Sequence, residues 1–543
     1  MLARVHSAAA FGIDAHVLDV EVDVSGGLPS FTIVGLPDAG AREARDRVRS
    51  ALRNSGYPPV EGVITVNLAP AALRKVGAAI DLPVAVAFLL IAGLEPALAR
   101  RRVYVGELGL NGEVRSTRGA LCLALAAREA GFEELVLPAD NAAEAEAVEG
   151  IRIVPVRSLA ATVSHLRGDA PEPGTAPPGQ TLPRTPAAAA GDFAEVRGQA
   201  VARRALEIAA AGGHHVLLSG PPGTGKTMLA RRVPTILPPL ARSEAIEVTK
   251  IHSIAGSLPS GAGLVSHPPF RAPHHGISAP GLVGGGTRPG PGEISLAHRG
   301  VLFLDELPEF RRDVLEGIRQ PLEEKRVSLV RVGGACVFPC DFLLIAAMNP
   351  CPCGFAGDPR RMCRCSAGER LRYARRLSGP LLDRIDLHVP VPPVPWADLQ
   401  RLTDGEPSAA VRARVEAARR VASERFGGRP DARNALLSAS DFSRFLALET
   451  SATGLLAAAV DRMGLSVRAV HRALRVARTI ADLEMSQTVD PKHLAEALGY
   501  RSRVFGEESD RLDRAPLSRL PSMATQAQAV KQLGLSKPRS KPA

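Results

Sequence analysis

The sequence predicts a multidomain α/β protein, and three observations lead to this expectation. Its 543 residues, 45% of them hydrophobic, are enough for about three or four domains with their own cores. The apolar run Val216–Leu218 is followed by a glycine-rich loop and by a helical pattern that begins at Met228. A second apolar run, Val301–Leu304, has the length and composition of a buried parallel strand. These runs favour an α/β core within a longer chain.

The composition favours an anionic partner. The net charge is +11, so a polyanion such as nucleic acid is a plausible partner. Arginine accounts for most of the 67 basic residues, so only clusters or motif positions indicate a site. Aromatic residues make up 4% of the chain, which disfavours recognition by base stacking. We therefore expect contacts with DNA phosphates rather than base reading.

The distribution of apolar residues predicts a soluble protein. No apolar run approaches the length of a membrane span, so we expect no membrane partner. Residues 1–7 lead directly into strand-like alternation, and they lack the apolar core and cleavage site of an export signal. The sequence therefore predicts a cytoplasmic location.

Residues 1–168 are predicted to form an α+β domain. Strand-like alternation covers residues 17–24 and 63–67, and helical periodicity covers 39–54 and 120–130. Four motifs in this part are Val34-Gly35-Leu36-Pro37-Asp38, Lys75-Val76-Gly77, Asp81-Leu82-Pro83 and Gly106-Glu107-Leu108-Gly109-Leu110-Asn111-Gly112. With these motifs the domain resembles the Lon-protease-like domain, of ribosomal S5 domain 2-like fold, found in magnesium-chelatase-related ATPases.

The resemblance to Lon-type proteases raises the hypothesis of proteolysis. Those proteases use a serine nucleophile that a lysine activates. The serine position corresponds to Ala79 and the lysine position to Leu121, and neither side chain can perform this chemistry. Lys75 is a remaining cation, but no nucleophile accompanies it. We expect a non-catalytic domain that serves as a scaffold or a binding module.

Two segments lack the composition of a packed core. Residues 169–190 are rich in proline and alanine, which predicts a semi-extended linker. Residues 504–543 form a tail whose last part carries lysine and arginine without acids, and this composition predicts disorder and weak, nonspecific attraction to DNA.

Residues 220–227 have the G-x-x-x-x-G-K-[ST] spacing of a phosphate-binding loop. They are Gly220, Pro221, Pro222, Gly223, Thr224, Gly225, Lys226 and Thr227. Between a strand and a helix, this spacing lets backbone N–H groups surround the phosphates of a nucleotide. We expect Lys226 to reach the β- and γ-phosphates and Thr227 to bind Mg²⁺.

Two acids follow the apolar run 301–304. Asp305 is placed to hold the magnesium shell, and Glu306 is placed to polarise the attacking water as a general base. An acid pair at the end of a strand is only moderately specific by itself. Together with the phosphate-binding loop upstream, it predicts hydrolysis of ATP.

Two further polar residues complete the predicted catalytic set. The apolar run 342–348 ends in Asn349, whose amide can orient water against the γ-phosphate. Arg384 can compensate the charge that develops during phosphoryl transfer, and its natural use is in the site of a neighbouring subunit. The alternative for this arginine is an ion pair with Asp383 or Asp386.

These motifs together resemble the ComM/YifB family of magnesium-chelatase-like AAA+ ATPases over nearly the whole folded length. The resemblance implies an AAA+ core at 191–395 and a helical lid at 396–503. Within the lid, residues 464–472 resemble the second sensor, whose arginine contacts nucleotide; we expect Arg468, with Arg472 as the alternative. Because an arginine supplied by a neighbour requires two subunits per site, the resemblance implies a hexameric ring.

Two insertions distinguish this family from a minimal ATPase. Residues 254–293 are rich in glycine and proline and are predicted to form a long functional loop or a broken helix. This segment contains His274 and His275, which are expected to be structural, with a metal site as the alternative. Residues 327–338 predict a β-hairpin. In related motors such a hairpin projects into the pore, so Arg331 is a candidate DNA contact, with an ordinary surface hairpin as the alternative.

The cysteines supply an independent prediction. Four of the seven form two C-x-C pairs, namely Cys351, Cys353, Cys363 and Cys365. Four thiolates match the tetrahedral coordination of structural zinc, although C-x-C is a less usual spacing than C-x-x-C, and free thiols are the alternative. The other three, Cys122, Cys336 and Cys340, are expected in the core.

Basic residues concentrate beside the second cysteine pair. Residues 358–376 contain only two acids and seven arginines, which are Arg360, Arg361, Arg364, Arg370, Arg372, Arg375 and Arg376. A metal-stapled module with this charge could bind a phosphate backbone and couple it to the nucleotide state. Solvated charge on a surface loop is the alternative.

Three functional classes follow from these observations. The family resemblance implies a hexameric helicase that promotes DNA branch migration during homologous recombination and natural transformation. The second class is a remodelling ATPase that acts on a protein complex, as magnesium-chelatase motor subunits do. The third is an ATP-dependent protease, which Ala79 and Leu121 argue against. The predicted ligands are ATP, Mg²⁺ and structural Zn²⁺.

Overall fold

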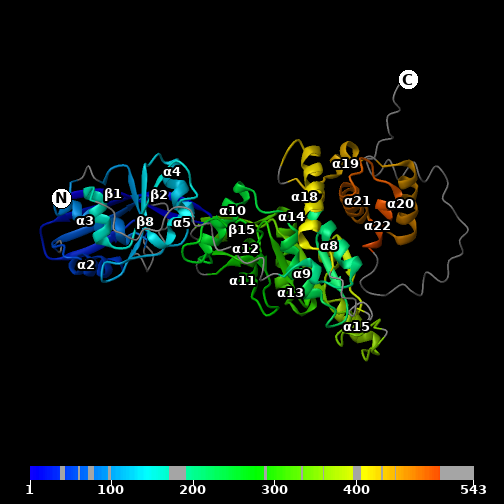
Figure 1. The fold of residues 1–543 in the computed structure, drawn as a ribbon. Coiled ribbons are helices and arrows are strands. Elements are labelled where there is room, and N and C mark those ends of the chain that lie inside the picture. The colour runs from blue at the N-terminus through cyan, green and yellow to red at the C-terminus, as the bar shows by residue number, and fades with distance from the viewer. Residues whose placement is uncertain are drawn as a thin grey trace, which may run out of the picture.

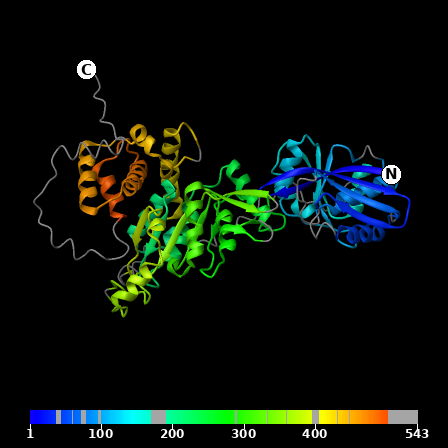
Figure 2. The same ribbon diagram turned by 180° about the vertical axis from the view of Figure 1, so that it is seen from behind.

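The computed structural model is elongated, with a sheet-containing N-terminal part, a central α/β core and a group of C-terminal helices at the other end (Figures 1 and 2). It describes residues 1–36, 43–58, 61–70, 79–95, 99–169, 191–286, 290–331, 334–358, 360–394, 405–429, 432–446 and 448–501. Nearly all of the predicted linker 169–190, the predicted tail 504–543 and Lys75 lie outside these residues. In the described part, no helix has both the length and the apolarity needed to cross a membrane.

A seven-stranded mixed sheet organises the N-terminal part, with strand order β3-β4-β2-β1-β5-β8-β9. Its strands are β1 (Leu2–Phe11), β2 (Asp14–Ser25), β3 (Ser30–Val34), β4 (Val63–Ala69), β5 (Arg102–Tyr104), β8 (Glu134–Pro138) and β9 (Arg152–Val156). β6 (Glu107–Leu108) and β7 (Val114–Arg115) form a separate pair. The two strands predicted in this part are confirmed as sections of β2 and β4, whose alternating residues face a common core.

Helices cover this sheet. They are α2 (Ala44–Asn54), α3 (Asp81–Ile91), α4 (Ala120–Glu129), α5 (Ala142–Ala145) and α6 (Leu159–Arg167). α3 is apolar around nearly its whole circumference, because it is buried among β1, β2 and α2. The predicted helix 120–130 corresponds to α4, and the predicted helix 39–54 corresponds to α2, which begins at Ala44.

A five-stranded parallel sheet forms the central core, with order β11-β14-β17-β10-β18. Its strands are β10 (Val216–Ser219), β11 (Phe270–Arg271), β14 (Val301–Leu304), β17 (Leu343–Met348) and β18 (Leu387–Pro390). The interior strands are apolar throughout because helices cover both faces of the sheet. The prediction of a long loop or broken helix at 254–293 was incomplete, since this segment supplies β11, the edge strand of the sheet.

The helices of the core are short to medium in length. They are α8 (Ala200–Gly212), α9 (Lys226–Ile236), α10 (Arg242–Ala255), α11 (Ala279–Val283), α12 (Glu293–Leu296), α13 (Arg312–Gly317), α14 (Arg319–Glu324), α15 (Ala367–Ala374) and α16 (Gly379–Leu382). Three 3₁₀ turns lie at Ala139–Asn141, Phe193–Glu195 and Leu307–Glu309. α8 packs against α9, the helix that begins at the end of the phosphate-binding loop.

Two hairpins project from the core. β12 (Gly284–Gly285) pairs with β13 (Gly290–Pro291), and β15 (Arg326–Arg331) pairs with β16 (Gly334–Pro339). The second pair confirms the hairpin predicted at 327–338. The turn at 332–333 and the side chain of Arg331 lie outside the described residues, so the predicted DNA contact of this arginine stays a prediction.

The C-terminal helices pack against α8 of the core. They are α18 (Ser408–Arg425), α19 (Ala439–Phe445), α20 (Thr450–Met463), α21 (Val467–Leu483) and α22 (Pro491–Gly499), with a 3₁₀ turn at Asn434–Leu436. α21 is strongly amphipathic, and its apolar residues share one core with α8, β10 and β18. These helices therefore share a hydrophobic core with the central α/β part rather than forming a core of their own.

α10 joins the N-terminal part to the core. It packs on α4, and Lys250 Nζ on α10 lies 3.0 Å from Asp14 Oδ1 in the N-terminal part. Arg242, at the start of the same helix, donates to Glu149 at 2.6 Å. Because the carboxylate of each ion pair is exposed to solvent, the two pairs add little stability to the packing of α10 on α4.

Candidate active site

The glycine-rich loop lies between β10 and α9, as predicted. Gly223 and Gly225 have φ values of 77° and 90°, which residues with a side chain rarely adopt. A Cβ at Gly220 would lie 2.1 Å from the carbonyl oxygen of Val391, so only glycine fits. The helix begins at Lys226, two residues earlier than the sequence pattern predicted. Its N-terminal N–H groups therefore face the loop, which is an arrangement that binds anions.

Lys226 is buried under the loop and holds three oxygen acceptors. Its Nζ donates to the carbonyl oxygens of Gly220 at 2.7 Å and Pro221 at 2.8 Å, and to Asn349 Oδ1 at 3.2 Å. Burial lowers the pKa of this ammonium, and the two acids that follow β14 oppose the shift. Asn349 reaches Lys226 because β17 is the neighbour of β10 in the sheet. The structure thus brings together three elements that the sequence singled out separately.

Thr227 and Asp305 meet beside the loop. Thr227 Oγ1 donates to Asp305 Oδ2 at 2.7 Å, and the other carboxylate oxygen of Asp305 accepts the N–H of Glu306 at 2.9 Å. Hydroxyl and carboxylate oxygens are the ligands that Mg²⁺ prefers, so this pair fits the predicted metal position.

Glu306 has an unusual backbone for a residue with a side chain. Its φ is 51°, in the left-handed region, and its side chain is 55% exposed. Strain of this kind persists where the surroundings fix the chain, and it is concentrated at functional sites. The carboxylate is therefore open to water beside the phosphate-binding loop, as a general base requires.

Arg384 lies near the amino ends of the parallel strands, whereas the phosphate-binding loop lies at their carboxyl ends, which form the opposite edge of the sheet. β18 is parallel to β10, with Leu387 opposite Val216, and Arg384 precedes β18. The loop at 220–227 instead follows β10, at the carboxyl ends of the strands. Four residues of strand separate the two edges by about 13 Å. Arg384 is therefore remote from the nucleotide loop of its own chain.

Arg384 and Arg468 share one carboxylate. Glu323 Oε1 lies 2.8 Å from Arg384 Nη2 and 2.5 Å from Arg468 Nη2. Arg384 is mostly buried and also donates to the carbonyl oxygen of Pro380 at 2.6 Å. The ion pair with Glu323 replaces the predicted alternative of Asp383 or Asp386. The two predicted nucleotide-contacting arginines thus lie together, on the face away from their own phosphate-binding loop.

Arg472, the alternative second-sensor residue, is committed to a buried ion pair. Its Nη1 lies 2.7 Å from Asp386 Oδ1. Burial acts to raise the pKa of Asp386, but the hydrogen bond with His214 and the charge of Arg472 hold that pKa well below its ordinary value. Breaking such a pair leaves a buried charge uncompensated, so this contact is structural. Arg468 is half-exposed and is the better candidate for reaching a ligand.

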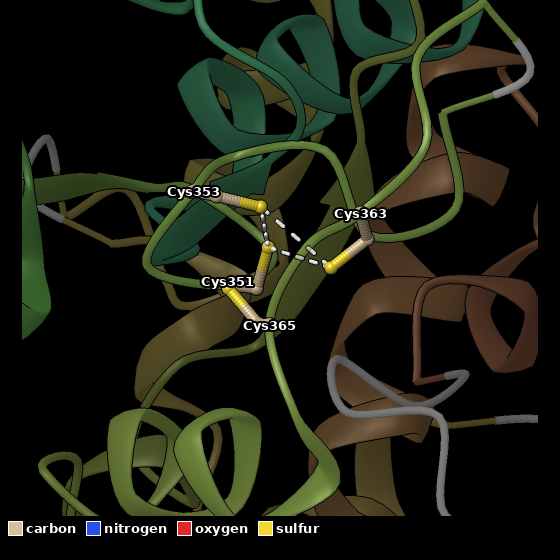
Figure 3. A group of neighbouring side chains, drawn as sticks. All are labelled: Cys351, Cys353, Cys363 and Cys365. Carbon is tan, nitrogen blue, oxygen red and sulfur yellow. Dashed lines mark hydrogen bonds between the residues drawn. The ribbon is translucent and has the colours of Figure 1, made fainter.

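The four predicted cysteines converge in one cluster (Figure 3). The Sγ atoms of Cys351 and Cys353 lie 3.3 Å apart, and Cys363 lies 3.7 Å and 3.6 Å from them; all four Sγ atoms, including that of Cys365, lie within 4.8 Å of one another. A tetrahedral site with Zn–S bonds of about 2.3 Å has S···S edges of about 3.8 Å. Backbone N–H groups of Phe355 and then Arg364 lower the pKa of Cys353 to about 6. The donor set therefore fits zinc in number, type and spacing.

The cysteine cluster contacts the phosphate-binding loop. Gly354, which directly follows Cys353, has φ 86°, and a Cβ there would lie 2.6 Å from Cδ of Pro222. Cys351 is fully buried and stands two residues after Asn349. The cluster is thus joined to the nucleotide site through both the loop and the amide that Lys226 contacts.

The arginines of 358–376 lie on the surface of the same module. All seven are exposed, and they are Arg360, Arg361, Arg364, Arg370, Arg372, Arg375 and Arg376. Arg376 pairs with Glu309 at 2.7 Å, whereas the other six have no carboxylate within ion-pair distance among the residues that the structure describes. Arg361 instead lies 5.1 Å from the ring centre of Phe355. We call these seven residues the arginine face.

Both positions that correspond to the Lon-type dyad carry apolar side chains. Ala79 packs against the apolar cluster that contains the buried Leu121. The two side chains carry neither a hydroxyl nor an amine, as the sequence indicated.

Three residues near the site were missed by the sequence reasoning. Glu323 joins the two arginines, and Gln199 Nε2 donates to the carbonyl oxygens of Thr224 at 3.3 Å and Pro392 at 2.6 Å. His275, expected to be structural, lies with its Nδ1 3.3 Å from Glu306 Oε2. The available signal was its place four residues beyond the strand 270–271, but only knowledge of that strand's neighbour in the sheet would have revealed the contact.

The chain is similar to characterised families along most of its length. The family described as magnesium chelatase, subunit ChlI, matches residues 192–399, subunit ChlI of Mg-chelatase matches 20–141, and the subunit ChlI C-terminal family matches 405–501. These three ranges contain the nucleotide site, the cysteine cluster, the C-terminal helices and part of the N-terminal sheet.

Individual relatives match over nearly their full length. Competence protein ComM of Haemophilus influenzae is 44% identical over 507 residues, covering 93% of this chain and 98% of the relative. The uncharacterized protein YifB of Escherichia coli K12 is 43% identical over 510 residues, covering 92% and 97%. An uncharacterized protein of Mycobacterium tuberculosis is 43% identical over 502 residues, covering 92% and 98%. The chain therefore belongs to the ComM/YifB family of magnesium-chelatase-like AAA+ ATPases.

Proposed function

We propose that this ATPase is a ring-forming motor that acts on DNA, a hexameric helicase that promotes branch migration during homologous recombination and natural transformation. The observation that carries the proposal is the arginine face, because six arginines that have no carboxylate partner among the described residues lie on the module that touches the phosphate-binding loop. A relative at 44% identity bears the name competence protein, which agrees with a role in DNA uptake.

The residues of the nucleotide site have separate roles in this proposal. The loop 220–227 and Lys226 hold the phosphates of ATP, and Thr227 and Asp305 would hold Mg²⁺, which supplies charge neutralisation at the β- and γ-phosphates. Glu306 takes a proton from the attacking water as general base. Asn349 positions that water against the γ-phosphate while its oxygen accepts from Lys226.

The second subunit completes the site in this proposal. Arg384 and Arg468 lie at the sheet edge away from their own loop, so they meet the γ-phosphate only when a neighbour's loop faces them. On ATP binding by that neighbour, the phosphate would replace Glu323 as their anionic partner. A hexamer is the ring that the family resemblance implies.

We propose that Cys351, Cys353, Cys363 and Cys365 bind structural Zn²⁺. When bound, the ion would supply four cross-links to a segment with few other restraints. The remaining cysteines, Cys122, Cys336 and Cys340, are buried away from the cluster, as predicted. The metal-stapled loop would support Pro222 and Asn349 from the side opposite the nucleotide.

Substitution of Cys363 by serine should remove the metal and destabilise the core. We expect about one zinc per wild-type chain and a large loss of zinc in the variant, with a melting temperature lower by about 2–4 °C for each kcal/mol of stability lost. Metal content and thermal unfolding, with and without a chelator, provide the measurement. Cys336→Ala is the control, because its thiol lies outside the cluster. Purified wild-type protein that contains no zinc would contradict the assignment.

Removal of three charges from the arginine face should weaken DNA binding. For the triple variant Arg360→Ala, Arg361→Ala, Arg364→Ala we expect the slope of log K against log salt to become shallower by about 2–3, since each duplex phosphate contact contributes about 0.9. Fluorescence anisotropy at several salt concentrations measures this slope. A triple variant in the N-terminal part, Arg101→Ala, Arg128→Ala, Arg152→Ala, removes the same charge elsewhere. Equal slopes for both variants would disprove the role of the arginine face.

The alternative function is remodelling of a protein complex, in the manner of a magnesium-chelatase motor subunit, and the descriptions of the matching families favour it. Proteolysis has less support because Ala79 and Leu121 occupy the dyad positions. A single assay separates the first two: ATP hydrolysis is measured with no DNA, with duplex, and with three- and four-stranded DNA, and the branched substrates are followed for strand exchange. We expect branched DNA to stimulate hydrolysis and to be resolved. Absence of both effects would favour the remodelling function.

A further inference from the structure

The general base Glu306 has a specific neighbour. Nδ1 of His275 lies 3.3 Å from Glu306 Oε2, and the two side chains are 37% and 55% exposed. Among the described residues, this is the ion-pair partner within 4 Å of the Glu306 carboxylate. A half-exposed glutamate without such a partner would sample several side-chain rotamers.

The sheet topology explains why these residues meet. β11 and β14 are adjacent and parallel, with Phe270 opposite Val301 and Arg271 opposite Leu302. The segments that follow the two strands therefore leave the sheet at the same edge. Three residues lie between the end of β11 and His275, which is enough to bring its ring to the first turn after β14.

The ring of His275 is held in place by its surroundings. It lies 4.0 Å from the ring of His274, centre to centre, and its edge faces Phe310 at 6.4 Å. His275 lies within a turn that is closed by the Ile277 N–H, which donates to the His274 carbonyl oxygen at 3.0 Å. His275 can therefore present its Nδ1 in a fixed direction to the carboxylate.

Fixing one carboxylate oxygen serves the chemistry of a general base. The backbone of Glu306 is already restrained by its left-handed conformation and by the N–H donation to Asp305. If an imidazole N–H holds Oε2, Oε1 is left to accept the proton of the attacking water. A base acts efficiently only when its accepting atom is within hydrogen-bond reach of that water.

The segment beyond His275 reaches the hairpin that precedes Asn349. It continues through α11 to Gly284 on β12, where a Cβ would lie 3.4 Å from Cδ1 of Leu329 on β15. β12 and β15 are packed together. A displacement of the hairpin by a bound ligand would therefore be transmitted along a short segment to the partner of Glu306.

We propose that His275 is a positioning residue that orients Glu306 for hydrolysis, and that through it the β15–β16 hairpin couples DNA engagement to ATP turnover. The coupling rests on the proposed function in DNA translocation. The orienting role rests only on the contact between the two side chains and on the ATPase activity of the family.

Two substitutions distinguish the effect of the His275 N–H donor from that of its aromatic ring. His275→Phe keeps the aromatic packing and removes the N–H, whereas His275→Asn loses the ring and keeps an N–H donor. Full removal of a general base costs about 10²–10⁴-fold in rate, and loss of its orientation should cost about tenfold. We expect His275→Phe to lower kcat by about that factor with KM for ATP within about twofold, and His275→Asn to retain most of the activity. His267→Ala, in the same insertion and beside Ser266, is the control.

Each outcome decides a different part of the proposal. Wild-type kcat in His275→Phe, or equal losses in the Phe and Asn variants, would overturn the orienting role. The DNA-stimulated rate should fall to the basal rate in His275→Phe; persistence of full stimulation there would overturn the coupling. If no DNA stimulates the wild-type protein, the proposed DNA function fails, while the basal kcat of the two variants still decides whether His275 orients Glu306.

Discussion

The Arg384→Ala variant should bind ATP nearly as well as the wild-type protein and hydrolyse it about 10³–10⁵-fold more slowly, the range over which an arginine supplied to a phosphoryl-transfer site accelerates the reaction. The reason is its position: Arg384 lies at the sheet edge opposite its own phosphate-binding loop. Its loss therefore leaves the contacts of Lys226 and Thr227 intact. Fluorescent-nucleotide binding and single-turnover hydrolysis measure the two effects separately.

The same variant can show that Arg384 acts across the subunit interface. Arg384→Ala subunits retain Glu306, and Glu306→Gln subunits retain Arg384, so a mixed ring contains some complete sites if the arginine comes from the neighbour. We expect the mixture to recover hydrolysis that neither variant shows alone. A mixture as inactive as its components would place the arginine in its own chain's site. Arg101→Ala, an exposed arginine in the N-terminal part, should behave like the wild type.

The Glu306→Gln substitution should abolish turnover while preserving ATP binding. It removes the proposed general base, whose loss costs about 10²–10⁴-fold, and leaves the hydrogen bond between Thr227 and Asp305 that would support Mg²⁺. We expect ATP to remain bound and unhydrolysed, so size-exclusion chromatography with ATP should show a stable assembled species. Glu309→Gln, three residues further along, is the control because that carboxylate contacts Arg376. Normal turnover in Glu306→Gln would exclude it as the base.

The local parts of the site could be predicted from the sequence because each is encoded in a short stretch. The loop 220–227, the acids after β14 and Asn349 each follow an apolar run, and parallel strands carry such residues to one edge of a sheet. The four cysteines were predicted from number and spacing, and the structure brings their sulfur atoms within 4.8 Å of one another. The hairpin was predicted from two alternating runs around glycines.

The remainder depends on which elements become neighbours, and periodicity does not contain that information. β11 has only two residues, too few for an alternating pattern, so the sequence predicted a loop or broken helix for the insertion 254–293. Without that strand, the contact of His275 with Glu306 could not be predicted. Glu323 was missed because it joins Arg384 and Arg468 from a helix that no motif marks. The face on which the second-sensor arginine lies also follows from helix packing rather than from the motif.

The position of the loop and of Arg384 at opposite edges of one sheet restricts the symmetry of any active assembly. Two surfaces on opposite sides of a subunit associate head to tail, and a two-fold axis cannot bring both pairs together in a dimer. If Arg384 completes the site of a neighbour, as we propose, an open row of such subunits leaves one loop without an arginine and one arginine without a loop. Under this proposal only closure of the row gives every subunit a complete site, so activity per chain should increase when the last interface forms.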